Sequence, residues 1–297
     1  MLTPAPLNQG DKIALVASAR KVSPEEMQPA IETLTGWGFE VVKGMYLFED
    51  DHQFAGTDAQ RWADLQMMLD DPSVKAILFA RGGYGSVRIV DKLDFTRFLK
   101  APKWLIGFSD ITVFHSHLNQ QVKVETLHAP MAINFGEMPP AVREKWKSAI
   151  TGGSISYEIP SHLFNRIGKV QAELTGGNLS ILYALSATPS DINTKGKILF
   201  IEDLDEYLYH VDRMMMNLKR SGKLKSLKGL IVGGMSDMRD NAIPFGKTAE
   251  EIILDAVREY NYPVCFGMPS GHLKENYPLI LGRKVKLEVG EKVRIVF

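Results

Sequence analysis

The chain has 297 residues, of which 45% are hydrophobic and 24% charged, fractions that are ordinary for a globular protein with one large or two smaller domains. Its 35 basic and 35 acidic side chains cancel, so nothing in the composition suggests general binding to nucleic acid or to anionic membranes. The single cysteine excludes an intrachain disulfide, and since we recognise neither a secretory signal nor an apolar run of transmembrane length, we expect a cytoplasmic protein.

The first half of the chain alternates short apolar runs with helical patterns, which is typical of a parallel sheet with helices on its faces. Residues 23–26 and the pair Thr57 and Gln60 predict two helix starts, each with a capping box. Strands are expected at residues 12–19, 39–45, 74–80 and 103–108, and further helices at residues 86–93 and from residue 110 onward.

The middle of the chain differs in composition. Residues 139–168 contain Pro, Gly and Ser clusters with weak periodicity, so we expect an inter-domain linker there, after a first domain of residues 1–138. The second domain, residues 169–297, is expected to hold strands at 196–203, 228–235 and 262–268, helices at 209–220 and 248–260, and a closing hairpin at 285–297.

Ser109 stands at the tip of the turn between a predicted strand and a predicted helix. This placement is that of a nucleophile elbow, but the pattern G-x-S-x-G is half met, because Gly107 is present and Ile111 replaces the second glycine. Within this window the interpretation as a helix N-cap is favoured. The interpretation as a nucleophile requires a base and an orienting acid elsewhere in the chain.

Two residues of the second half fit those roles. His272 lies in a Gly- and Pro-bounded loop directly after a predicted strand, where α/β proteins keep their sites. Glu202 ends an apolar strand, which fits a solvated strand end and an orienting acid equally well. His115 and His117 point to different faces of a predicted helix and make a poor metal pair, and His128 is interpreted as structural.

The segment ARGGYGSVR, residues 80–88, is a glycine-rich loop between a strand and a helix. It lacks both the G-x-G-x-x-G fingerprint and the Lys-Ser/Thr pair of a P-loop. A phosphate cradle, a set of backbone N–H donors for an oxyanion, and a plain turn with positive φ are all compatible with it.

Six segments in chain order resemble the LD-carboxypeptidase family, which includes muramoyltetrapeptide carboxypeptidases and microcin C self-immunity peptidases. They are FAGTDAQRWADLQMMLDDPSVKAILFARGGYGS, LIGFSDIT, LHAPM, LTGGNLS, ILFIEDLDE and GHLKENYPLILG. Two places differ from the family pattern: VASAR stands where the first strand is usually followed by Ala-Pro-Ser, and Ala129 replaces a glycine.

The resemblance implies an N-terminal flavodoxin-like domain with a parallel sheet, carrying the nucleophile, and a C-terminal α/β domain with a mixed sheet, carrying the acid and the base. It implies a serine peptidase with the triad Ser109, Glu202 and His272, and an oxyanion hole formed by the backbone N–H groups of Gly83 and Asp110. It implies no metal and no cofactor, and it leads us to expect a homodimer.

The substrate implied by the resemblance is a cytoplasmic murein tetrapeptide, cut between its L-configured diamino acid centre and the terminal D-alanine. Arg81 and Asn178 are candidates for binding the terminal carboxylate. One alternative is a peptidase of the same family acting on a peptidyl-nucleotide, for which Trp146 is the tryptophan placed to stack on a base. Another is a non-catalytic module for a sugar or nucleotide, which predicts that the three triad residues lie apart.

Overall fold

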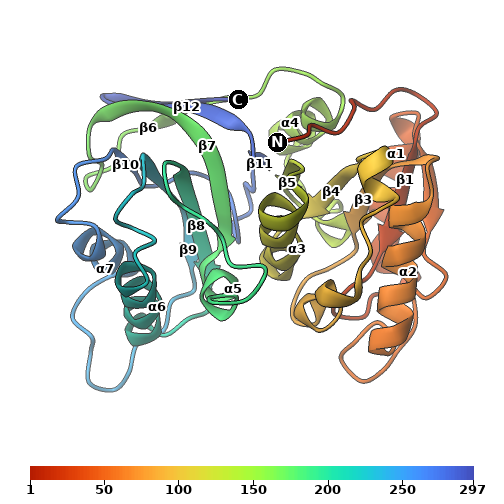
Figure 1. Cartoon of the computed structure of the whole chain (residues 1–297), viewed down its shortest axis with the longest axis horizontal. Coiled ribbons are helices and arrows are strands. Elements are labelled where there is room, and N and C mark those ends of the chain that lie inside the picture. Colours follow the sequence, from red (N-terminus) through yellow and green to blue (C-terminus); the bar gives the residue numbers. More distant parts are fainter.

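The computed structural model describes all 297 residues and contains two sheets flanked by helices (Figure 1). The first sheet has the order β11-β5-β4-β3-β1-β2. Its strands are β1 (Lys12–Val16), β2 (Glu40–Lys43), β3 (Val74–Phe79), β4 (Trp104–Gly107), β5 (Thr126–His128) and β11 (Leu279–Leu281). Strands β1 to β5 are parallel and follow the order 2-1-3-4-5, which confirms the predicted flavodoxin-like arrangement.

Strand β11 departs from the prediction of a purely parallel first sheet. It comes from the far end of the sequence and pairs antiparallel with β5, Ile280 opposite Leu127, so the first sheet is mixed at that edge. The three-residue strand carries no pattern of its own in the sequence, and it forms because its residues, all fully buried, cover the otherwise open edge of β5.

The helices beside the first sheet begin where local chemistry predicts. They are α1 (Pro24–Gly36), α2 (Asp58–Asp70), α3 (Thr112–His117) and α4 (Pro140–Ile150). Both α1 and α2 start with the predicted capping boxes, Ser23 with Glu26 and Thr57 with Gln60. The helix expected at residues 86–93 is wrong, because two short 3-10 turns replace it, η1 (Ser86–Arg88) and η2 (Val90–Lys92). The segment is too short and too rich in β-branched residues for a stable α-helix.

The remaining short helical segments are single turns. They are η3 (Phe98–Lys100), η4 (Ser109–Ile111) directly before α3, the π-helical η5 (Leu118–Val122) and η6 (Ala132–Asn134).

The second sheet has the order β10-β9-β8-β7-β12-β13-β6. Its strands are β6 (Ser156–Pro160), β7 (Gly168–Asn178), β8 (Ile198–Leu204), β9 (Gly229–Ser236), β10 (Val264–Cys265), β12 (Lys284–Val289) and β13 (Lys292–Val296), and its helices are α5 (Leu179–Ala184), α6 (Leu208–Arg220) and α7 (Ala249–Ala256). The long strand β7 pairs antiparallel with β12 over its first half and parallel with β8 over its second. The sheet is therefore mixed, as predicted, and β12 with β13 forms the expected closing hairpin.

The segment predicted as a linker, residues 139–168, contains two ordered elements. Helix α4 packs on the first half of the protein, where Trp146 lies against Trp37 and Phe135, and strand β6 joins the edge of the second sheet. The chain passes between these two elements from one half to the other (Figure 1). The division into domains at residues 139–168 stays a prediction.

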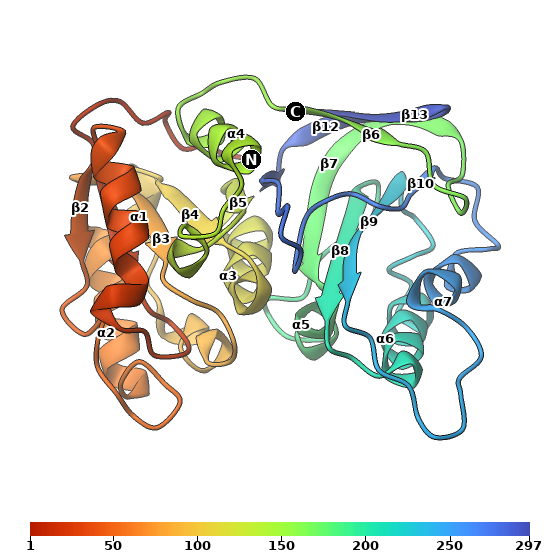
Figure 2. The same cartoon turned by 180° about the vertical axis from the view of Figure 1, so that it is seen from behind.

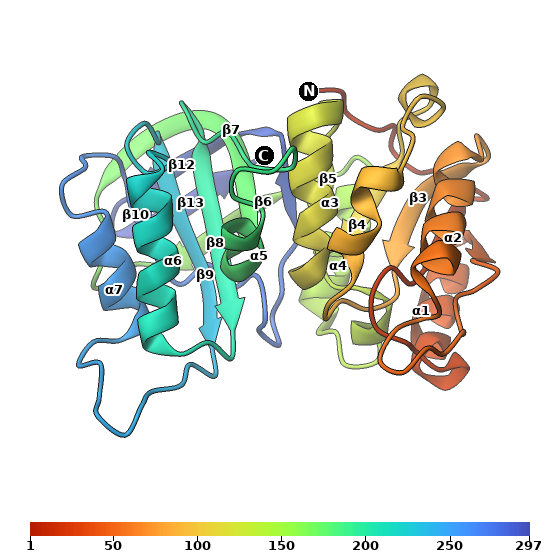
Figure 3. The same cartoon turned by 60° about the horizontal axis from the view of Figure 1, so that its bottom comes forward.

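Three hydrophobic cores hold the layers together. Helices α1 and α2 cover opposite faces of the first sheet (Figure 2). The core on the α2 face also contains residues of α3. Helices α6 and α7 cover one face of the second sheet and enclose another core (Figure 3). The largest core runs from the α1 face of the first sheet to the second sheet without interruption, from Leu15 and Leu127 to Phe200 and Val285. The two halves are thus packed as one body, and residues between them are fixed in place. No helix in the structure has the length and apolar character needed to cross a bilayer.

Candidate active site

Ser109 occupies a sharp turn between β4 and the helical segment η4. Its φ of +62° is in the left-handed region, which is uncommon for a residue with a side chain and stores strain. Gly107 permits the turn, since a Cβ at that position would lie 2.8 Å from the Ile111 side chain. The Ser109 side chain caps no helix, and its Oγ lies 3.1 Å from His272 Nε2. The geometry is therefore that of a nucleophile elbow, and the N-cap interpretation is wrong.

His272 connects Ser109 to Glu202 across the two halves of the protein. Its Nδ1 donates to Glu202 Oε2 at 2.7 Å, and its backbone N–H donates to the same oxygen at 3.1 Å. Since a carboxylate only accepts, Nδ1 carries the proton and the lone pair of Nε2 faces the Ser109 hydroxyl. The three residues lie in one hydrogen-bonded chain, with Glu202 at the end of β8 and His272 in the loop after β10.

Burial and charge act on His272 in opposite directions. Burial lowers the pKa of the imidazole, but the hydrogen bond and the negative charge of Glu202 outweigh it, so the pKa of His272 is raised above its ordinary 6.5. Glu202 is fully buried, and Gly271 is required beside it because a Cβ there would lie 2.5 Å from Glu202 Oε2. The Phe108 ring packs against the imidazole with the ring centroids 4.9 Å apart, which fixes its plane.

His128, interpreted from the sequence as structural, lies in the core of the protein. It is fully buried between Phe108 and Phe200, at centroid distances of 5.9 and 5.0 Å. Burial lowers its pKa well below the usual range, so the ring is neutral. It packs beneath the site without touching the hydrogen-bonded chain.

The glycine loop after β3 lies directly against Ser109. A Cβ on Gly82 would be 3.2 Å from Ser109 Cβ, and Gly83 has a φ of +109° that favours glycine. The backbone N–H groups of Gly83 and Asp110 have no hydrogen-bond acceptor within the chain. Both amides are therefore free to donate to the oxygen of a carbonyl group attacked by Ser109 Oγ, which is what an oxyanion hole requires.

Two buried side chains hold this loop, and sequence reasoning missed both roles. The Asp110 carboxylate accepts the Ser86 N–H at 2.9 Å, and Arg61 Nη1 donates to Gly85 O at 3.2 Å and Ser18 O at 2.6 Å. Arg61 and Asp110 are each 1% exposed. The only signal in the sequence is that Arg61 falls on the same face of α2 as the buried Leu65 and Met68, an unusual place for a charge.

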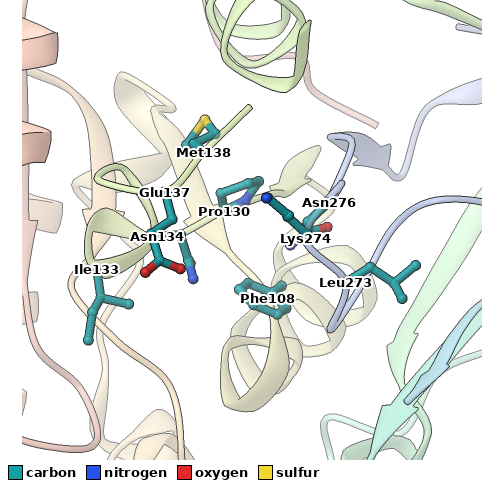
Figure 4. Close-up of a pocket in the computed structure, with 9 residues that line it drawn as sticks. All are labelled: Phe108, Pro130, Ile133, Asn134, Glu137, Met138, Leu273, Lys274 and Asn276. Atoms are coloured by element: carbon teal, nitrogen blue, oxygen red, sulfur yellow. The ribbon is translucent and has the colours of Figure 1, made fainter. Parts of the chain in front are cut away.

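A cavity of about 670 Å³ is lined by Phe108 and Leu273, the residues next to Ser109 and His272 in the sequence (Figure 4). Its floor is the Phe108 ring, and its two sides come from the segment after β5 and from the loop that carries His272. The polar side chains that face it are Asn134, Glu137, Lys274 and Asn276. No group of three or more His, Cys, Asp or Glu side chains in the structure is arranged to hold a metal ion.

Comparison with known proteins agrees with this geometry. Residues 13–129 match the LD-carboxypeptidase N-terminal domain and residues 171–287 match the LD-carboxypeptidase C-terminal domain. The chain belongs to the LD-carboxypeptidase family. It is therefore a serine-type carboxypeptidase. The resemblance on the six segments is confirmed, and the prediction of a non-catalytic module with its triad residues apart is wrong.

Relatives and solved structures cover nearly the whole chain. A probable murein peptide carboxypeptidase of Bacillus subtilis is 34% identical over 99% of this chain and 93% of its own length. The crystal structure of a muramoyltetrapeptide carboxypeptidase from Oxalobacter formigenes is 29% identical, covers 96% of this chain and 98% of its own, and has a TM-score of 0.88. A microcin C7 self-immunity protein shares the fold, with a TM-score of 0.90 at 24% identity over 100% of this chain and 98% of its own.

The two residues predicted to bind the substrate carboxylate have other partners in this LD-carboxypeptidase. The Arg81 guanidinium lies 3.7 Å from the Glu26 carboxylate, away from the cavity. Asn178 Nδ2 donates to Asp203 at 2.9 Å, and Oδ1 accepts from Ile181 N at 3.1 Å, which caps α5. A role for either in substrate binding stays a prediction.

Trp146 cannot stack on a nucleotide base. It is fully buried, and its indole N–H donates to Pro130 O at 3.1 Å. The sequence suggested a stacking role because Trp146 lies in the segment predicted as a linker, but α4 turns it into the core. The peptidyl-nucleotide alternative thereby loses its candidate for stacking on the base.

Proposed function

We propose that this protein removes the terminal D-alanine from murein tetrapeptides by way of an acyl-enzyme on Ser109. The observation that carries the proposal is the hydrogen-bonded chain from Ser109 through His272 to Glu202 in a member of the LD-carboxypeptidase family. The names of the relatives, among them a murein tetrapeptide carboxypeptidase of Pseudomonas aeruginosa, support the substrate.

The first half of the reaction forms the acyl-enzyme. His272 Nε2 takes the proton of the Ser109 hydroxyl as Oγ attacks the carbonyl carbon of the diamino acid residue. Glu202 holds the imidazole in the required tautomer and stabilises the imidazolium. The N–H groups of Gly83 and Asp110 donate to the developing oxyanion, and each such donor contributes about 3 kcal/mol in the transition state.

The intermediate then breaks down. The imidazolium gives its proton to the leaving nitrogen, the C–N bond breaks, and D-alanine departs with a neutral amine. A water molecule, deprotonated by His272, attacks the ester carbonyl, and the proton returns to Ser109 Oγ as the tripeptide leaves. Each attack begins with a neutral imidazole and each breakdown begins with an imidazolium, so His272 serves first as base and then as acid in both halves.

The test is incubation with purified murein tetrapeptide and measurement of free D-alanine. The wild-type protein is expected to release D-alanine, and Ser109→Ala to lower the rate by at least about 10⁴-fold. Ser161→Ala is the matched control, because Ser161 is exposed and its hydroxyl has no partner. Brief mixing and mass spectrometry of the intact protein should detect the tripeptidyl ester in the wild type alone. Release that survives in Ser109→Ala would refute the mechanism, and no release by the wild type would refute the substrate.

The proposal extends to the cellular role. We place the reaction in the cytoplasm, in the recycling of peptidoglycan fragments, and expect the protein to act as a homodimer. Light scattering on the purified protein tests the assembly, and a mass of a single chain would contradict it. Accumulation of tetrapeptides in cells that lack the protein tests the role.

A further inference from the structure

The loop that carries His272 also carries a cation without a partner. Lys274 is exposed, lines the cavity over the Phe108 ring, and makes neither an ion pair nor a side-chain hydrogen bond. It is the only positively charged side chain that lines this cavity. In Figure 4 its Nζ points into the cavity toward Pro130, opposite Asn134 and Glu137.

This loop is rigid at its base. Tyr277 N donates to Pro269 O at 2.9 Å, Ser270 Oγ donates to Tyr277 O at 2.8 Å, and Gly271 N donates to Asn276 Oδ1 at 2.8 Å. The backbone of Lys274 lies inside this closed loop, two residues after His272. The backbone position from which the Lys274 side chain extends into the cavity is therefore set by the same contacts that position His272.

The cavity lies on the side of the departing residue. His272 must give its proton to the leaving nitrogen, so the leaving group lies next to the imidazole. The cavity floor is Phe108, whose ring packs on that imidazole, and one wall consists of Leu273, Lys274 and Asn276. A leaving residue that accepts the proton of His272 would thus extend into this cavity.

An exopeptidase has to recognise the terminal carboxylate of its substrate. Three bonds separate the scissile carbonyl carbon from the carbon of that carboxylate, so the two lie at most about 4 Å apart. The group that binds it must then project into the space next to the nucleophile. Arg81 does not line this cavity and has Glu26 as its partner.

We infer that Lys274 binds the terminal carboxylate of the leaving residue and makes the enzyme selective for a free C-terminus. The inference rests on the proposed function. The Lys274 ammonium can follow the departing amino acid, because it has no ion pair or side-chain hydrogen bond to break. Its charge also remains in water when the cavity is empty, so no buried ion has to be stabilised in the free enzyme.

The test compares two substrates, the tetrapeptide ending in D-alanine and the same peptide ending in D-alaninamide. For the wild type, kcat/KM is expected to be about 10- to 100-fold higher for the free acid, the selectivity of one charge-assisted hydrogen bond. In Lys274→Met that ratio falls to about one, because the value for the acid drops while that for the amide changes by less than about threefold. Lys274→Arg is expected to keep most of the ratio, since it retains the charge.

Two further variants serve as comparisons. Lys225→Met is the matched control, because Lys225 is exposed, unpaired and remote in sequence from the cavity, and it should leave both values unchanged. Arg81→Met tests the cation that the sequence suggested, and it is expected to keep the selectivity for the acid. Thermal unfolding of each variant checks that the fold is intact.

The outcomes separate the inference from the proposed function. If the wild type cleaves neither peptide, the proposed function fails and the role of Lys274 falls with it. If the wild type releases D-alanine and Lys274→Met keeps the selectivity, or loses activity on both peptides equally, the proposed function stands and the inference is overturned. Loss of selectivity in Arg81→Met alone would also overturn it.

Discussion

Replacing Asp110 by alanine separates two functions that this residue has at once. Its backbone N–H is one of the two proposed oxyanion donors, and alanine retains it. Its buried carboxylate accepts the Ser86 N–H at 2.9 Å and so holds the glycine loop that bears the other donor, Gly83. The substitution therefore removes the support of the loop while leaving the nucleophile, the base and the acid untouched.

The size of the effect follows from these contacts. Ser86 is fully buried, so its N–H loses its acceptor without gaining water, which lowers the free energy of unfolding by about 1–3 kcal/mol. A misplaced oxyanion donor costs about 10²- to 10³-fold in kcat. Since Arg61 still holds the Gly85 carbonyl, at 3.2 Å, we expect the lower end, a fall of about 10²-fold in kcat with little change in KM.

The assay is the initial rate of D-alanine release over a range of tetrapeptide concentrations, together with unfolding in urea. Asp110→Asn is the matched comparison, because its amide oxygen can still accept the Ser86 N–H, and its kcat should stay within about tenfold of the wild type. An Asp110→Ala protein that is less stable but keeps its kcat would refute the reasoning, as would a rise in KM at constant kcat.

Three other predictions concern the acid, the seam between the halves and the cavity. In Glu202→Gln, kcat should fall by about 10⁴-fold. The acidic limb of the pH profile of kcat/KM should move to lower pH, because loss of the carboxylate lowers the pKa of His272, whose imidazole must be neutral to act as base. An acidic limb at an unchanged pH would contradict this. Gly177→Ala should lower the free energy of unfolding by about 1–3 kcal/mol, because the new Cβ would lie 2.5 Å from Thr112 Oγ1. Gly196→Ala is the control and should lower it less, because nothing lies within 4 Å of a Cβ there. Equal melting temperatures of the two variants would count against the prediction. A tetrapeptide ending in D-leucine should be cleaved within about tenfold of the D-alanine peptide, since a cavity of about 670 Å³ has room for the larger side chain, and a rate over about 100-fold lower would show otherwise.

The sequence predicts those helix starts and strands that depend only on residues close to one another in the chain. The capping boxes of α1 and α2 depend on residues three positions apart, and the strands β1, β3 and β4 are short, mostly apolar runs. In contrast, β11 is three residues long and forms only because the edge of β5 needs a partner. The helix expected at residues 86–93 failed partly for a local reason, its β-branched residues, and partly for a distant one, since its start is held by Asp110 from a later element.

The candidate site also has features that the sequence shows and features that only the fold reveals. Ser109 could not be told from an N-cap, because both occur at a strand–turn–helix junction, and the decision came from the resemblance to a family. That His272 reaches Ser109 across 163 residues of sequence is a property of the packing of two sheets. Arg61 and Lys274 lie in segments that resemble the family, but nothing in the sequence assigns them a role, because each acts only through the loop or cavity that the fold places beside it.

The return of the chain to the first sheet limits how this protein can be divided or recombined. The His272 loop runs from β10, at the edge of the second sheet, to β11, at the edge of the first. A fragment ending at residue 168 would lack β11 and expose the edge of β5 to strands of other chains. A chimera that takes its second half from a relative would take the strand that completes the first sheet as well. The pairing of β5 with β11 must therefore be inherited together with the His272 loop, which ties the evolution of the two halves to each other.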